Sequence, residues 1–176
     1  YPRDYDFTYD PYAARALLAE AGYPGGANFP QVIFSQEGGG SANSAEALQA
    51  QWQSALNVTV EINISEPRVH WDKLNRKDFT LALGGWTADY PDATTYLDLW
   101  KIGSGYNFTH WEDARYDQAL AAAAAELNPE VRMTKLRAAE GFLMEHMPII
   151  PIVFEKDKML IHPTMKNFTP NAMNRP

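Results

Sequence analysis

The stretch Val58-Thr59-Val60-Glu61-Ile62-Asn63-Ile64-Ser65 alternates apolar and polar side chains without a break. Successive side chains of a β-strand point to opposite faces, so this pattern predicts a half-buried strand whose four branched apolar residues face a core. Two further apolar runs, at 30–35 upstream and 79–83 downstream, predict two more short strands. Three strands this close in the sequence indicate one sheet.

Helical patterns separate these strands. An apolar stripe at helical spacing covers 44–56, and a shorter helix is expected over 69–75. Upstream, Asp10 and Pro11 form a typical helix start, and Gly22 ends that helix. The resulting order, strand–helix–strand–helix–strand, predicts an α/β fold with a partly parallel sheet.

The second half of the chain is mainly helical in pattern. A helical turn or two is expected at 94–100, and an alanine-rich helix over 116–127. Asn128 is placed to cap the next helix. Beyond it, 149–154 and 158–162 have the composition of two strands in hairpin-like sequence, and Pro151 predicts that the first is at an edge or carries a bulge.

Composition excludes several function classes. The chain has 176 residues, which suits one domain, and a formal net charge of −7. With no basic stripe it is not expected to bind nucleic acid or to dock on anionic lipid. It has no cysteine, which excludes disulfides, Cys-based metal sites and thiol catalysis.

One motif combines side chains suited to ligand binding. Directly after the apolar run 79–83, the segment 84–92 reads Gly-Gly-Trp-Thr-Ala-Asp-Tyr-Pro-Asp. Trp86 offers a flat apolar face, Asp89 a negative charge and Tyr90 some of both, which suits a ligand with a ring-like or apolar part and a cationic or hydroxyl-bearing part. The alternative interpretation is a core tryptophan and a turn-capping aspartate.

Catalytic and cofactor motifs find little support. The four histidines are widely spaced, so no metal site is expected, and Gly38-Gly39-Gly40-Ser41 lacks the lysine of a phosphate-binding loop. There is no G-x-S-x-G. Asp89 and Asp92 could form an acid/base pair of the glycosidase kind, but paired carboxylates in such a turn are commonly caps. We therefore predict a non-enzyme without a cofactor.

Five segments, in order along almost the whole chain, resemble one family. They are Tyr9–Gly25; Trp52–Glu61; Asp78–Pro91 with its W-x-A-D-Y motif; Tyr106–Asp117; and Met147–Val153. The chain resembles the C-terminal part of the extracytoplasmic solute-binding proteins of peptide-type ABC importers, the oligopeptide- and dipeptide-binding family.

The resemblance implies a fold, partners and a location. Members have two lobes that enclose the ligand, so residues 10–176 are expected to form the C-terminal ligand-binding lobe, periplasmic-binding-protein-like, with a mixed, mostly parallel sheet flanked by helices. Residues 1–9 are expected to be a connecting segment near the inter-lobe hinge. The implied partners are a small peptide or other small solute, the N-terminal lobe of the same protein and a membrane permease, and the implied location is extracytoplasmic.

The resemblance also implies site residues. In peptide-binding members the carboxylate of W-x-A-D-Y, here Asp89, pairs with the α-ammonium group of the peptide. Trp86 lines a side-chain pocket, Thr87 and Tyr90 are adjacent in the motif, and Asn107 lies near the cleft. An oligosaccharide-binding relative is the alternative, with Trp86, Tyr90 and Trp111 as sugar platforms and Asp89 as a hydroxyl acceptor.

Overall fold

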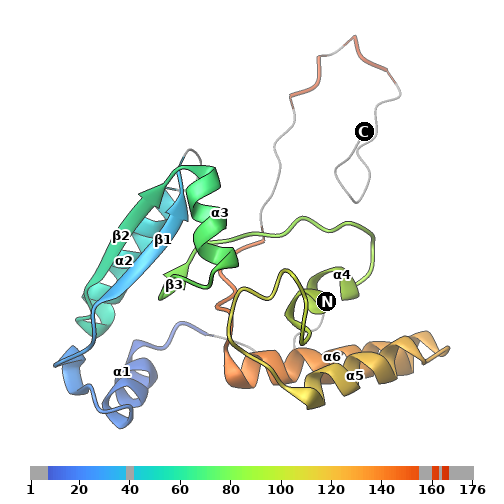
Figure 1. The fold of residues 1–176 in the computed structure, drawn as a ribbon, viewed down its shortest axis with the longest axis horizontal. Coiled ribbons are helices and arrows are strands. Elements are labelled where there is room, and N and C mark those ends of the chain that lie inside the picture. The colour runs from blue at the N-terminus through green and yellow to red at the C-terminus, as the bar shows by residue number, and fades with distance from the viewer. Residues whose placement is uncertain (1–7, 39–41, 155–159, 163, 167–176) are drawn as a thin grey trace. The chain divides into compact units, whose positions relative to one another are not determined.

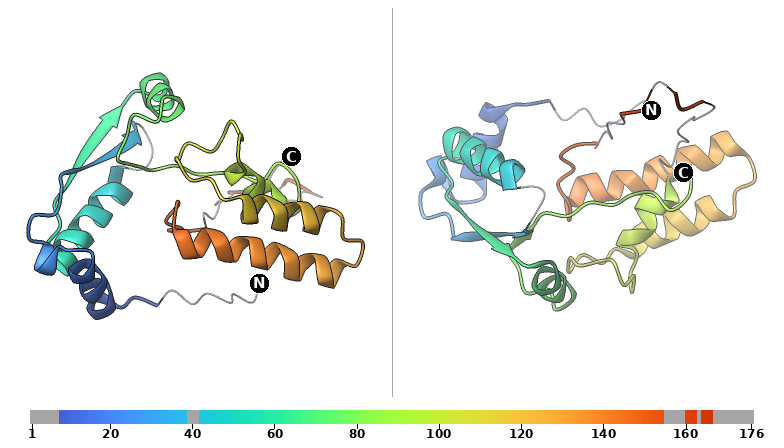
Figure 2. Two further views of the ribbon diagram at one scale, coloured as in Figure 1. Left: turned by 60° about the horizontal axis from the view of Figure 1, so that its bottom comes forward. Right: turned by 90° about the horizontal axis from the view of Figure 1, so that it is seen from above.

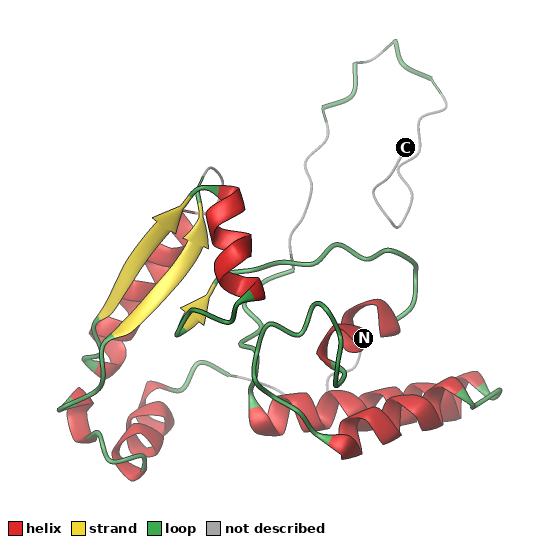
Figure 3. Ribbon diagram, viewed as in Figure 1, coloured by secondary structure: helices red, strands yellow, loops and turns green. Residues whose placement is uncertain are grey.

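The computed structural model describes residues 8–38, 42–154, 160–162 and 164–166. These residues belong to two compact units, unit 1 (Tyr1–Gly85) and unit 2 (Trp86–Pro176), which are described in turn. Unit 1 contains every strand that the structure describes, and unit 2 is built from helices and loops (Figure 3). No helix among the described residues is both long and apolar enough to cross a bilayer.

Unit 1 is organised around a parallel sheet. Its strands are β1 (Val32–Glu37), β2 (Val60–Ser65) and β3 (Leu81–Ala82), in the spatial order β2-β1-β3. The central strand pairs with both neighbours in parallel register, Phe34 opposite Ile62 on one side and Leu81 on the other. The predicted α/β layering with a parallel sheet is confirmed, with strand boundaries shifted by about two residues, as expected for element ends.

Helices flank the sheet because each buries an apolar face on it. Helix α2 (Ala42–Leu56) runs along one face (Figures 1 and 2), where Trp52 packs against Phe34 with ring centroids 5.9 Å apart. Helix α3 (Pro67–Asn75) packs on β1. The main core cluster of unit 1 contains four buried apolar residues: Phe34, Ala45, Val58 and Val60.

Helix α1 (Pro11–Glu20) lies beside α2 and begins as the sequence predicts. The Asp10 carboxylate accepts from the amides of Tyr12 and Ala13 at 3.0 and 2.9 Å, which satisfies two of the donors left over at a helix start. A short 3₁₀ turn, η1 (Pro24–Gly26), follows. Gly26 has φ +77°, and a Cβ there would lie 2.5 Å from the Asn57 carbonyl oxygen, so only glycine fits.

The alternation that predicted β2 fails toward the end of the strand, where Asn63 and Ser65 are half-buried and Ile64 is exposed. Ile64 was expected to face the core but is 55% exposed. It lies at the end of an edge strand, where its side chain reaches Gly38, which offers no side chain to cover it. The alternation of side chains predicts which face of the strand is buried, but it does not predict how many residues along that face are covered by other parts of the chain.

Unit 2 is built on a pair of helices that pack side by side (Figures 1 and 2). They are α5 (Ala114–Ala124) and α6 (Pro129–His146); the short helix α4 (Thr94–Leu97) and the 3₁₀ turn η2 (Asp98–Trp100) precede them. Asn128 caps α6 as predicted, accepting from the amides of Glu130 and Val131. The core is a cluster of buried residues from three helices: Leu97, Tyr116, Leu120, Ala123, Leu136, Ala139 and Leu143.

The predicted strand at 149–154 is wrong. After α6 the chain turns at Met147, which has the left-handed φ of 47°, and residues 150–154 are irregular. Their larger apolar side chains are exposed, from 47% at Ile152 to 82% at Phe154. A strand exists only when paired, no strand partner for this segment lies in the described ranges, and Pro151 lacks an amide hydrogen to offer one. Of the second predicted strand, 158–159 fall outside the described residues and 160–162 are not strand.

Candidate functional site

The motif predicted to bind ligand forms a connecting segment in unit 2. From Trp86 to Asp92 the backbone has neither helix nor strand, and α4 follows at Thr94 (Figure 3). Thr87, Asp89 and Tyr90 are exposed, with Tyr90 at 42%, whereas Trp86 is half-buried. The structure therefore presents the polar members of the motif on the surface of unit 2.

Trp86 packs on Tyr106 from the next loop. The ring centroids are 4.8 Å apart with an interplanar angle of 64°, an edge-to-face contact. Tyr106 is 53% exposed, so the pair forms an aromatic surface. The Trp86 indole Nε1 is buried and has no hydrogen-bond partner within the described residues, which leaves one strong donor unused.

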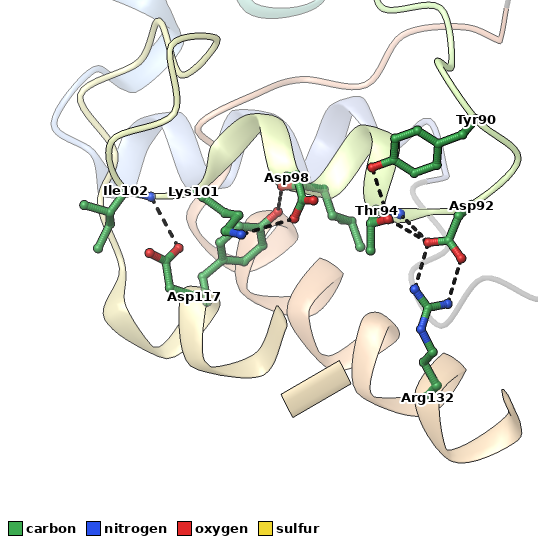
Figure 4. Close-up of polar contacts among 10 residues, drawn as sticks. Tyr90, Asp92, Thr94, Asp98, Lys101, Ile102, Asp117 and Arg132 are labelled. Atoms are coloured by element: carbon green, nitrogen blue, oxygen red, sulfur yellow. Dashed lines mark hydrogen bonds and ion pairs between the residues drawn. The ribbon is translucent and has the colours of Figure 1, made fainter. Parts of the chain in front are cut away.

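The second aspartate of the motif is bound into the protein. Arg132 of α6 donates from both terminal nitrogens to Asp92, at 2.7 and 2.9 Å (Figure 4). Asp92 Oδ1 also accepts from the Thr94 amide at 3.0 Å and from its hydroxyl at 2.7 Å. These donors hold the pKa of the Asp92 carboxyl well below its usual range, with the Arg132 hydrogen bonds as the largest cause.

This network reaches Tyr90. The Thr94 hydroxyl lies 3.3 Å from the Tyr90 hydroxyl (Figure 4). Thr94 gives its single hydrogen to the Asp92 carboxylate, which can only accept, so the Thr94 oxygen is left to accept from Tyr90. The Asp92 amide also donates to the Tyr90 carbonyl at 2.9 Å.

Asp89 is held through its backbone. Its amide donates to the hydroxyl of Thr95 at 3.0 Å, and Thr95 is 4% exposed in the first turn of α4. The Asp89 side chain is exposed. A carboxylate on a fixed backbone at the surface is suited to meet a cationic group without moving.

Asn107 lies in the same unit, and its side chain forms hydrogen bonds with residues of its own loop. Its amide nitrogen donates to the carbonyls of Trp100 and Trp111 at 3.3 and 3.0 Å, and its oxygen accepts from Thr109 at 2.8 Å. Asn107 is 8% exposed. These contacts show a residue that shapes the loop 100–111; a direct ligand contact stays a prediction.

Two side chains that the oligosaccharide-binding and glycosidase interpretations require make other contacts within unit 2. Trp111, a sugar platform in the oligosaccharide alternative, is partly buried and packs edge-on against buried Tyr116 of the unit 2 core, with ring centroids 5.0 Å apart. Asp92, the partner of Asp89 in the glycosidase alternative, has its pKa lowered by Arg132 and is a poor proton donor near neutral pH. No three potential His, Cys, Asp or Glu ligands gather as a metal site within the described part of the chain.

Sequence reasoning missed Arg132 and Thr95. Arg132 is 40 residues from its partner Asp92, so no local pattern connects them. Thr95 reads as an ordinary residue of a short helix. The only local signal was Asp92-Ala93-Thr94, in which an aspartate precedes a helix start.

Comparison with known proteins assigns the class. Residues 1–108 match the family model described as bacterial extracellular solute-binding proteins, family 5 Middle. The chain belongs to this family of extracellular solute-binding proteins, whose members are binding receptors rather than enzymes.

Individual relatives carry different ligands in their names. The chain is 32% identical over 142 residues to the oligopeptide-binding protein OppA of Bacillus subtilis (strain 168), covering 80% of this chain and 26% of the relative. It is 29% identical over 155 residues to the probable deoxycholate-binding periplasmic protein YgiS of Escherichia coli (strain K12), covering 88% and 29%.

A solved structure shows the same fold. The periplasmic oligopeptide-binding protein OppAIV from Borrelia burgdorferi has a TM-score of 0.79 and 27% identity, over 84% of this chain and 30% of that one. The predicted periplasmic-binding-protein-like lobe is confirmed. The chain spans about 30% or less of the length of these relatives.

Proposed function

We propose that this protein is the solute receptor of a peptide-type ABC import system. It binds an oligopeptide or dipeptide outside the cytoplasm and delivers it to a membrane permease. Residues 10–176 form the C-terminal ligand-binding lobe, with 1–9 as the connecting segment near the hinge. The ligand is enclosed between this lobe and the N-terminal lobe, and closure is favoured through contacts that improve in the closed state.

The observation that carries this proposal is an exposed carboxylate on a backbone that is held in place. Asp89 is exposed, and its amide donates to the hydroxyl of buried Thr95. A fixed, exposed carboxylate next to an aromatic surface suits the α-ammonium end of a peptide followed by a side chain. A carboxylate and an ammonium 4 Å apart attract by about 4 kcal/mol at an effective dielectric constant of 20.

The remaining site residues take supporting roles in this proposal. Trp86 packs on a ligand side chain together with Tyr106, and its Nε1 can serve a ligand carbonyl once the indole shifts. Thr87 and Tyr90 are exposed in the same motif as Trp86, and Asn107 holds the loop that carries Tyr106.

Calorimetry on the full-length protein tests the proposal. We expect a peptide with a free amino terminus to bind about thirtyfold or more tightly than its N-acetylated form, because removing one partner of a charge pair costs about 2–5 kcal/mol. In Asp89→Asn the two forms should bind alike. Asp78→Asn, which removes another exposed carboxylate, from unit 1, is the matched control and should retain the preference.

Two other ligands complete the experiment. Deoxycholate, which has a carboxylate and no ammonium, and cello-oligosaccharides, which are uncharged, should bind weakly. Tight binding of either one, or equal affinity for free and acetylated peptides in the unmodified protein, would overturn the proposed role of Asp89.

A further inference from the structure

The candidate site is irregular in secondary structure yet tied to a rigid element. The segment 86–93 has no ladder of backbone hydrogen bonds to fix it. Two contacts hold the segment instead. The Asp89 amide donates to the hydroxyl of buried Thr95, and Arg132, 40 residues along the chain from Asp92, donates to the Asp92 carboxylate. They hold the segment on both sides of Tyr90.

Arg132 can serve as an anchor because its helix is fixed. It lies one turn before Leu136, which is 1% exposed in the core of unit 2. Its guanidinium meets both oxygens of Asp92, a planar two-point contact that fixes orientation as well as distance (Figure 4). Asp92 also accepts hydrogen bonds from the Thr94 amide and hydroxyl, which holds the adjoining backbone in place.

We propose that Arg132 and Asp92, together with Thr95, are positioning residues that set how selectively Asp89 recognises a free amino terminus. Asp92 is three residues from Asp89, so moving the Asp92 anchor moves the backbone that carries the recognising carboxylate. Without the anchor, the backbone that carries the Asp89 carboxylate takes up more positions, most of them poor for a charge contact. The inference depends on the proposed function because it concerns the same site.

The alternative role for the ion pair is stability alone, and unit 2 contains a control for it. Lys135, also on α6, pairs with Glu126 at 2.7 Å and does not touch the motif. The Lys135 and Arg132 side chains are 36% and 28% exposed, so the two pairs are of similar burial. Lys135→Met removes an ion pair from the same helix without altering the anchor.

The measured quantity is the ratio of dissociation constants for the N-acetylated and free forms of one peptide, determined with the full-length protein. Arg132→Met and Thr95→Val should each lower this ratio at least about threefold, with Arg132→Lys between Arg132→Met and the unmodified protein because a lysine gives one contact in place of two. Lys135→Met should retain the ratio of the unmodified protein. Circular dichroism checks that each variant is folded, and Thr95→Val, which keeps the side-chain shape, serves if Arg132→Met does not fold.

The outcomes separate the two proposals. If the unmodified protein prefers the free amino terminus and Arg132→Met and Thr95→Val keep that preference, the positioning role is refuted while the proposed function stands. An equal fall in the Lys135→Met ratio also refutes it, since the effect would then follow from stability. If the unmodified protein shows no preference, the role of Asp89 fails and this inference fails with it.

Discussion

Removing the Tyr116 hydroxyl should destabilise unit 2 by more than the net value of a typical hydrogen bond. Tyr116 is fully buried, and its hydroxyl donates to the Leu97 carbonyl at 2.5 Å, joining α5 to the end of α4. Tyr116→Phe keeps the ring in the core but leaves that carbonyl without its donor. Burial also raises the Tyr116 pKa far above its ordinary value, so the hydroxyl remains a donor throughout the range in which proteins are studied.

The size of the effect follows from the cost of an unsatisfied group. A buried polar group left without its partner costs about 1–3 kcal/mol, compared with about 0.5–1.5 for the net value of a typical hydrogen bond. We expect Tyr116→Phe to lower the free energy of unfolding by about 2 kcal/mol. At a urea dependence of about 2 kcal/mol per molar, the midpoint should fall by about 1 M.

Urea unfolding followed by tryptophan fluorescence is the assay, since the Trp111 ring lies 5.0 Å from that of Tyr116. Tyr96→Phe is the control, because this tyrosine of α4 is 47% exposed and such surface changes stay within about 0.5 kcal/mol. Equal midpoints for the two variants would show that the hydroxyl contact contributes nothing and that the reasoning is wrong.

Two other changes should be measurable in the same assay. Burial lowers the pKa of His70, which is 2% exposed, below the 6.5 of an unperturbed histidine. The unfolded chain therefore binds the proton first as the pH falls, and the free energy of unfolding should decrease from about pH 6.5 downward. His70→Gln should remove this pH dependence between pH 7.5 and 5, and an unchanged slope would contradict the assignment. Leu136→Ala should lower the free energy of unfolding by about 2–5 kcal/mol because it opens a cavity in the core of unit 2. Leu127→Ala, at a 96% exposed position, should lower it by less than about 0.5 kcal/mol. Similar losses for both variants would rule out the burial argument.

Local signals were sufficient to predict most of the fold. The caps Asp10 and Asn128 determine helix starts through contacts two or three residues away, and hydrophobic periodicity is set by the geometry of a single element. Such features depend on neighbours in the sequence, so the sequence alone reveals them. The order of strands and helices then left few topologies beyond a parallel sheet.

The failures involve partners that are distant in the chain. The run 149–154 has strand composition, but composition states only a preference, and pairing decides whether a strand forms. The same holds at the candidate site: the motif containing Asp89 is continuous and could be found, whereas its anchor Arg132 lies on another helix. Asn107 shows the reverse case, since three internal contacts account for its amide before any ligand is considered.

The brevity of β3 has a consequence for solubility. A sheet normally exposes, along its outermost strand, a row of amides and carbonyls that can pair with another molecule and start aggregation. β3 spans only Leu81–Ala82, with one further bond from the Leu83 amide to the Ser35 carbonyl. Ending the strand so early leaves, at the β3 edge of the described sheet, too short a row of unpaired backbone groups to act as a template for another molecule.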